Sequence, residues 1–182
     1  IKAANNTEVT SPDPDGAGPA VPLTGTVYTD PRRNVETKRV TPAGETTEAD
    51  RDAMGRVTAV WNPGRARNES ASSTYSYTVD RSIGVSTVTT NTLTQTSTGL
   101  GYMTSVELLD SLLRPRQTQT HSISNGIVVA DMFYDSRGLV ALTGTYAANT
   151  SPGTSLIAAT TWGDVKPNVR VTRDYAGRPL AQ

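Results

Sequence analysis

The feature that most constrains this chain is a short pattern that recurs along it. The pattern is Asp, two variable residues, a small or turn-competent residue, then Arg and an apolar residue. Asp52–Val57 and Asp174–Pro179 are its clearest copies. Partial copies begin at Asp30, Asp110 and Asp135. Along the chain the five Asp positions are 22, 58, 25 and 39 residues apart, an irregular period that indicates loops inserted between repeated units.

Each copy predicts a β-turn that joins two antiparallel strands. The Asp carboxylate accepts a hydrogen bond from the N–H two residues on, and the variable residues occupy the corners of a type I turn. Gly at the fourth position adopts a positive φ and closes the hairpin with a bulge, after which Arg begins the outgoing strand. The residues assigned to these structural turns are Asp52, Gly55, Arg56, Asp110, Arg114, Tyr134, Asp135, Gly138, Asp174, Gly177 and Arg178.

The turns alone do not make a stable fold, because one hairpin cannot bury its own apolar face. Several hairpins must therefore stack side by side. Thr is the commonest residue and Val is plentiful, and both favour extended backbone. Hydrophobic residues are only 35% of the chain, which is little for a compact two-layer core. We predict an all-β fold of antiparallel β-hairpin repeats that form a curved sheet.

Strand-like runs lie between the turn signals. Tyr75, Tyr77 and Val79 alternate with Ser and Thr, as expected when one face of a strand is packed and the other is wet. Residues 127–134 are more apolar, which predicts a strand buried on both faces. Further strands are expected at residues 56–61, 84–95, 139–146 and 169–175.

Two segments differ from this pattern. Residues 1–22 contain turn and linker chemistry, with Pro at four positions, and are predicted to form an N-terminal loop or extended arm. Residues 23–182 then make up the repeat sheet. Val106–Arg114, stopped by Pro115, has an apolar spacing that fits a short helix as well as a strand and turn, and both interpretations stay open.

Composition and motifs predict no enzyme. The formal net charge is +0 and no basic stripe is present, so nothing indicates nucleic acid as a partner. No apolar run approaches ~18–20 residues, so no membrane span is predicted. The chain has no cysteine and His121 is its only histidine, so it lacks a nucleophile–base set and zinc ligands. Asp13, Asp15 and Gly16 lack the later ligands of a calcium loop and are interpreted as a turn. No catalytic residue, cofactor or metal is predicted.

The repeated motif resembles that of the YD-repeat, or Rhs (rearrangement hotspot), family. Tyr134 and Asp135 followed by Gly138 match the Tyr-Asp-x-x-Gly core for which the family is named. Asp52–Val57 matches the related Asp-x-x-Gly-Arg-apolar form, and Asp110–Thr118 is similar to a stretch of large Rhs proteins from actinomycetes. The resemblance covers roughly residues 28 to 182.

The sequence also departs from the family pattern. Tyr precedes Asp only at Tyr134, while Arg51, Leu109 and Arg173 hold that place in the other copies. Arg33 and Leu113 lie where Gly is expected, which leaves the turn type at Asp30 and Asp110 open. The self-cleaving core with paired aspartates, which follows the repeats in many bacterial members, is not found in this sequence.

The resemblance implies a structural role in a secreted or cell-surface bacterial protein. In such proteins the repeats build a shell that encapsulates a toxin or effector polypeptide until delivery. The expected partners are the remaining shell segments of the same parent protein and the enclosed polypeptide. We interpret the sequence as cut from a longer chain, and expect its exposed sheet edges to pair with further shell segments or with copies of itself.

The alternative is a YD-repeat adhesion module that binds cell-wall or host carbohydrate. Aromatic rings stack on sugars in many binding modules, although such a stripe is also what packs one sheet against another. The glycan-stacking candidates are Trp61, Tyr75, Tyr77 and Trp162, with Tyr102 and Tyr146 as further aromatics.

Overall fold

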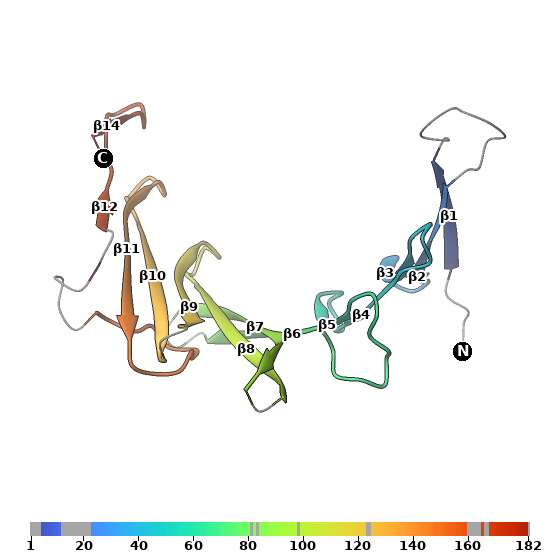
Figure 1. Cartoon of the computed structure of the whole chain (residues 1–182). Coiled ribbons are helices and arrows are strands. Elements are labelled where there is room, and N and C mark those ends of the chain that lie inside the picture. The colour runs from blue at the N-terminus through green and yellow to red at the C-terminus, as the bar shows by residue number, and fades with distance from the viewer. Residues whose placement is uncertain are drawn as a thin grey trace, which may run out of the picture. The chain divides into compact units, whose positions relative to one another are not determined.

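The computed structural model of the chain is all-β in every residue that it describes, namely 5–11, 23–80, 82, 84–97, 99–122, 125–159, 165 and 168–181 (Figure 1). The predicted fold class is confirmed. The strands are β1 (Asn5–Ser11), β2 (Leu23–Asp30), β3 (Val35–Val40), β4 (Thr46–Arg51), β5 (Val57–Trp61), β6 (Ser73–Asp80), β7 (Val85–Thr96), β8 (Gly99–Leu109), β9 (Pro115–His121), β10 (Ile127–Tyr134), β11 (Val140–Ala148), β12 (Asn168–Arg170), β13 (Thr172–Arg173) and β14 (Pro179–Ala181).

Each strand pairs with its neighbours in sequence. β1 to β12 form one antiparallel sheet in that order, and β13 pairs with β14 in a hairpin of its own. The prediction of successive antiparallel hairpins is therefore confirmed. The chain forms two compact units, residues 1–75 with 92–101 and residues 76–91 with 102–182. Asp30 and Asp52 belong to the first unit, and the later Asp turns belong to the second.

The Asp turns share one backbone geometry. At Asp52, the Gly55 N–H donates to the Asp52 carbonyl at 3.0 Å, and the Asp52 N–H donates to the Arg56 carbonyl at 2.9 Å. Gly55 has φ 84°, the left-handed conformation that glycine adopts without a Cβ clash. The result is a type I turn followed by a left-handed residue, a common three-residue hairpin loop. The same pair of backbone bonds recurs at Asp110, Asp135 and Asp174.

Two turns achieve this geometry without glycine. Leu113 has φ 59° and takes the left-handed place in the Asp110 turn, so the turn type left open by the sequence is unchanged there. The Asp30 turn is one residue longer, and its left-handed residue is Asn34 at φ 53° rather than Arg33. A Cβ in this conformation costs about 1–2 kcal/mol, which Asn relieves better than Leu. Leu113 is therefore a strained position.

A second irregularity follows each turn on the outgoing strand. In the hairpin of Asp52, Asp50 pairs with Ala59 and Arg51 pairs with Val57, so Thr58 has no partner across the hairpin. The equivalent bulge residues in the other hairpins are Thr37, Arg116, Ala141 and Leu180. A bulge bends its strand and increases the local twist, so every unit of the repeat carries a bend at the same place.

One open alternative about secondary structure is resolved, and one expectation is corrected. The helix considered for Val106–Arg114 does not form, because β8 runs to Leu109 and the Asp turn follows directly. β10 is not buried on both faces. Ile127 and Val129 are fully buried, while Val128 between them is 40% exposed. The continuous apolar run therefore forms a strand with one buried face and one partly exposed face.

The N-terminal segment, predicted as a loop or extended arm, contains a paired strand. Within residues 1–22, Asn5–Ser11 forms β1, which pairs along its whole length with Leu23–Thr29 of β2. Thr and Val supply the β propensity in this stretch, and pairing with β2 satisfies main-chain groups that a free arm would leave to water.

The two units differ in how many hydrophobic side chains they bury. In the second unit, one buried cluster joins Ile127, Val129, Tyr146 and Val165, and another joins Val85, Val106 and Leu108. In the first unit, the buried hydrophobic side chains among the described residues are only Ala59 and Ala71. The thin apolar composition is thus concentrated on one face of the second unit, and the first unit depends on its backbone ladders and polar side chains.

The strain at Leu113 is testable. Leu113→Gly should raise the free energy of unfolding by about 1 kcal/mol, because glycine removes the left-handed penalty and the lost side chain is mostly exposed. Urea denaturation followed by circular dichroism measures the change. Leu112→Gly is the matched control, since Leu112 is equally exposed without a positive φ, and it should not stabilise. Equal effects of the two variants would refute the strain.

Candidate functional site

The Asp carboxylate organises each turn. In the Asp52 turn, Oδ1 accepts the N–H groups of Met54 and Arg56 at 2.9 and 3.0 Å, and Oδ2 accepts Nε of Arg56 at 2.7 Å. The Asp110 turn repeats all three bonds with Leu112 and Arg114. The sequence analysis anticipated the first of these bonds but not the bond to the fifth residue or the ion pair.

The Asp135 turn shows how the repeat tolerates the loss of its Arg. Leu139 holds the fifth place there, and its N–H still donates to Oδ1 of Asp135 at 2.9 Å. Arg137, two residues after the Asp, supplies the missing cation, with Nη2 at 3.1 Å from Oδ2. The carboxylate keeps both types of partner although the sequence motif is altered.

These bonds lower the pKa of four turn carboxyls, those of Asp52, Asp110, Asp135 and Asp174. At Asp135 the N–H of Leu139 is the strongest influence, and at Asp174 the N–H of Arg178 is strongest, followed by its guanidinium. At Asp52 and Asp110, loss of water around the carboxyl favours a higher pKa, but the Arg side chain and two N–H groups together outweigh it and lower the pKa.

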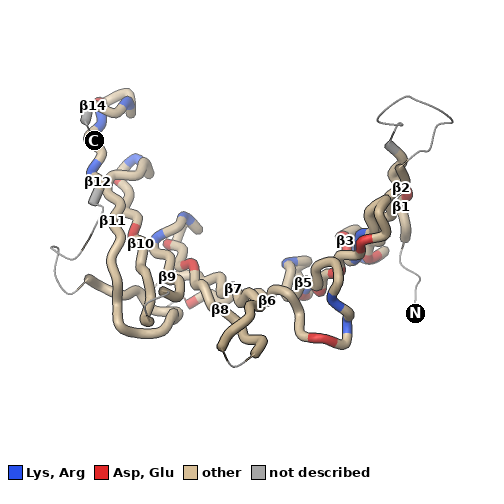
Figure 2. Tube along the Cα trace, in the orientation of Figure 1, with Lys and Arg blue, Asp and Glu red and all other residues tan. Residues whose placement is uncertain are grey.

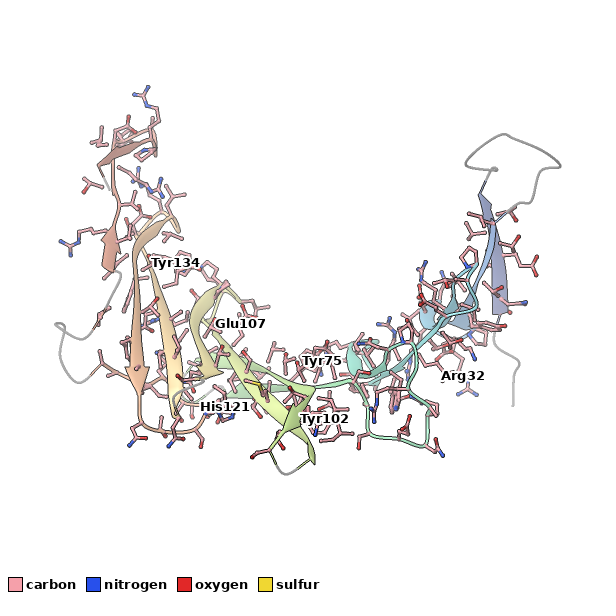
Figure 3. The ribbon with its side chains drawn as sticks, viewed as in Figure 1. Arg32, Tyr75, Tyr102, Glu107, His121 and Tyr134 are labelled. Carbon is pink, nitrogen blue, oxygen red and sulfur yellow. The ribbon has the colours of Figure 1, made fainter. Side chains whose placement is uncertain are left out.

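Long side chains connect successive hairpins where the backbone ladder ends. Registered pairing between β9 and β10 stops at Gln117 and Asp131, short of the turn. Beyond that point the hydroxyl of Tyr134, directly before Asp135, donates to the carbonyl of Pro115 at 2.8 Å. Figure 3 places Tyr134 at this end of β10 and His121 at the opposite end of β9.

The same connection recurs in the Asp52 and Asp174 copies with Arg in place of Tyr, whereas Leu109 of the Asp110 copy has no side-chain donor. Arg51 donates through Nε to the Glu36 carbonyl at 2.7 Å, and Arg173 donates through Nη2 to the Val140 carbonyl at 3.3 Å. In all three cases the acceptor directly precedes the bulge of the previous hairpin. Two of the three departures from Tyr, Arg51 and Arg173, therefore perform the same task, because Arg is also a long side chain with a donor at its end.

A second set of bonds runs forward to the next turn. Arg33 donates through Nη1 to the Asp52 carbonyl at 3.0 Å, and Arg137 donates through Nη1 to the Asp174 carbonyl at 2.8 Å. Both residues directly precede the left-handed residue of their own turn. Figure 2 shows Arg at the tips of the β8–β9 and β10–β11 hairpins. We call these backward and forward contacts the inter-turn bonds.

Glycine also serves the packing of one turn on the next. A Cβ at Gly138 would lie 3.0 Å from Nη1 of Arg114, and a Cβ at Gly177 would lie 3.3 Å from Cδ1 of Leu139. In both pairs the neighbour is the fifth residue of the preceding turn. Two features therefore favour glycine at the fourth position of these turns. One is the positive φ, and the other is the side chain that lies close to its Cα.

Among the described residues, one Asp turn was not predicted from the sequence. Asp80 accepts the N–H of Ser82 through Oδ1 at 2.8 Å, and Gly84 follows with φ 65°. The signal was present, but Gly is one place later than in the motif, as Asn34 is in the Asp30 turn. With Asp80 included, the long interval of 58 residues divides into 28 and 30, and the intervals become 22, 28, 30, 25 and 39 residues.

The second unit also carries a buried polar cluster that the sequence analysis did not foresee. Gln117 and Gln119 on β9 are 2% and 0% exposed, and lie on the same face as the apolar core. Their amides bond to each other, to Asp131, and to the main chain of residues 153–157. Glutamine is usually a surface residue, so these two were expected to be exposed. No neighbouring residue in the sequence indicates that a distant segment covers them.

Tyr146 completes this glutamine cluster. Its hydroxyl lies 2.6 Å from the Ile157 carbonyl and 3.1 Å from Oδ2 of Asp131. Burial, followed by the charge of Asp131, raises the pKa of Tyr146 to about 12. The hydroxyl therefore keeps its proton at neutral pH and remains a donor.

The other predicted site residues are dispersed. Trp61 is in the first unit, where Arg67 lies over its ring at 3.9 Å and its Nε1 donates to the Glu69 carbonyl at 3.1 Å. Tyr75 and Tyr77 are half-buried on β6. Tyr146 is buried, and Tyr102 is exposed. Trp162 and the predicted turn at Asp13–Gly16 lie outside the described residues.

Across the described ranges, no group of three or more His, Asp or Glu residues is placed to hold a metal ion. No helix long and apolar enough to cross a membrane occurs in the part of the chain that the structure describes. Comparison of the sequence with protein-family models and with curated proteins gives no match.

The backward inter-turn bond is testable at Tyr134. Tyr134→Phe removes the hydroxyl that reaches the Pro115 carbonyl but keeps the ring, over which Arg114 lies at 4.1 Å. We expect a loss of about 0.5–1.5 kcal/mol in the free energy of unfolding, measured with urea. Tyr75→Phe is the matched control on another strand. A loss no larger than the control's would show that the bond contributes nothing.

The lowered carboxyl pKa values predict a loss of stability in acid. A carboxyl whose pKa is lower in the folded state stabilises the fold above its unfolded pKa, near 3.8, and this contribution is lost as pH falls through the folded pKa. Carbon-13 NMR titration of the Asp carboxyls should report the low values. Arg56→Met should raise the pKa of Asp52 and leave that of Asp174 unchanged. A shift of both, or of neither, would contradict the assignment.

Proposed function

We propose that the chain is a wall segment of a YD-repeat (Rhs) shell, which encloses a toxin or effector polypeptide in a secreted or cell-surface bacterial protein. The observation that carries the proposal is the set of inter-turn bonds. They occur at equivalent positions between successive hairpins, and they use backbone acceptors, so they can be repeated with different sequences. Such bonds favour a continuous wall over a set of independent hairpins.

The mechanism is steric. A wall protects a cargo only while its hairpins stay together along their whole length. Backbone ladders join the strands through most of the sheet, and the inter-turn bonds continue the connection beyond the bulges, where the ladders have ended. Tyr134, Arg51 and Arg173 thus support the weakest places of the wall.

The aromatic residues give less support to the carbohydrate alternative. A sugar-stacking platform needs open ring faces, and one face of Trp61 is covered by Arg67. The ring of Tyr146 is buried and its hydroxyl is committed to main-chain and carboxylate partners. The buried glutamine pair, by contrast, bonds to polypeptide main chain, which is the kind of cargo that the proposal requires.

Two measurements on the full-length protein that contains this chain test the proposal. Electron cryomicroscopy should reveal a hollow shell with polypeptide inside, and proteolysis should leave that polypeptide intact. Weakening the wall with Arg33→Met and Tyr134→Phe should expose the cargo to protease faster, whereas Tyr75→Phe should not. An open particle without an enclosed chain, or one that binds glycans through Trp61, would overturn the proposal.

A further inference from the structure

The glutamine pair binds main chain rather than side chains. The Ile157 N–H donates to Oε1 of Gln117 at 2.9 Å, and Nε2 of Gln117 donates back to the Ile157 carbonyl at 2.8 Å. Gln119 makes the corresponding bonds to the Gly153 N–H and the Ser155 carbonyl, both at 2.8 Å. These four bonds link two side-chain amides to one segment, which follows β11 in the chain and bends at Thr154 and Ser155 (Figure 1).

The residues that the two glutamines bind alternate along the segment. Gln117 and Gln119 are two residues apart on one face of β9, and the residues that they bind, 153, 155 and 157, also alternate. An amide side chain offers one donor and one acceptor edge, like a peptide group, so the pair imitates the edge of a neighbouring strand. Such recognition is independent of the side chains of the bound segment.

The orientation of both amides is fixed by neighbouring residues. Arg116 pairs with Oδ1 of Asp131 at 2.9 Å, and that carboxylate oxygen accepts Nε2 of Gln117 at 2.7 Å. Oε1 of Gln117 then accepts Nε2 of Gln119 at 2.8 Å. The order Asp131, Gln117, Gln119 therefore sets which edge of each amide donates and which accepts, before any segment binds.

One side chain of the bound segment is recognised. Ile157 packs against the cluster of Ile127, Val129, Tyr146 and Val165. A cavity of about 280 Å³ continues beside it, lined in part by Arg116, Phe133 and Ala159. The cavity is lined largely by the segment itself, Leu156–Ala159, so the face combines main-chain binding with one apolar anchor.

We propose that this face is a binding site for a polypeptide segment of a second chain, with an apolar residue at the anchor, and that residues 153–157 occupy it here as an internal ligand. The inference rests on the proposed function, because it names the residues that would hold an enclosed polypeptide on the wall. Gln117 and Gln119 bind its main chain, Asp131 orients them, and Tyr146 donates to the carbonyl at the anchor.

The test first releases the internal ligand. Gly153→Pro with Ile157→Pro removes both N–H donors and the anchor, and leaves the face unchanged. Thr154→Pro with Leu156→Pro is the matched control, since it adds two prolines to the same segment at alternate positions. Hydrogen exchange of β9, β10 and β11 confirms that the sheet stays folded in each variant.

A fluorescent peptide with the sequence of residues 151–159 is then titrated by anisotropy. It should bind the released variant, and bind the wild type and the control at least about tenfold more weakly, because their face is occupied. Methylating the peptide nitrogens that correspond to Gly153 and Ile157 should weaken binding by about tenfold or more. Scrambling the other residues while keeping the anchor Ile should change affinity by less than about threefold, because they are not recognised.

The outcomes separate this inference from the shell proposal. Failure of every peptide to bind a folded, released variant would overturn the inference, and so would equal binding after Gln117→Leu with Gln119→Leu. Peptide binding together with an empty full-length particle would support the binding site and refute the shell proposal. If the full-length particle encloses a chain but no peptide binds this face, the shell proposal is supported and the binding site is refuted.

Discussion

The whole structure depends on the bonding of a few carboxylates to the backbone beside them. The Asp side chains of the repeat accept hydrogen bonds from N–H groups that a tight turn would otherwise leave to solvent. The same bonds fix the direction of the outgoing strand. Because the turn is closed locally, the strands between turns are free to vary in length and composition. That freedom explains why the repeat is recognisable at its turns and hardly elsewhere.

Stability between hairpins comes from two different sources. In the second unit, apolar side chains and a saturated polar cluster share one face, and Gln117 and Gln119 are buried without an unpaired amide. In the first unit, charged side chains are prominent, as where Arg67 pairs with Asp50 and covers Trp61. Exposed ion pairs contribute little individually, so the backbone ladder and the inter-turn bonds matter more there.

Much of the local structure was predictable because its cause is local. The Asp-x-x-Gly turns and the absence of a helix-favouring composition both follow from neighbouring residues. The packed face predicted for β6 holds at Tyr75 and Tyr77 but not at Val79, which is 66% exposed. Where prediction failed, the cause was distant or ambiguous in sequence. Leu113 adopts a left-handed conformation because the Asp110 turn requires it, and the apolar run of β10 does not reveal that Val128 faces solvent. Asp80 escaped notice because its Gly84 lies one place late.

The sequence by itself determined the turns, because a carboxylate and the N–H groups that it binds are at most four residues apart. Only the tertiary structure decided which contacts connect one turn to the next. Tyr134 and Arg173 act on hairpins other than their own, so their equivalence is invisible until the strands are paired. The same holds for Gln117, whose amide becomes a main-chain binding group only when residues forty positions later cross it. Contacts over such separations depend on register and bulges, which no short motif encodes.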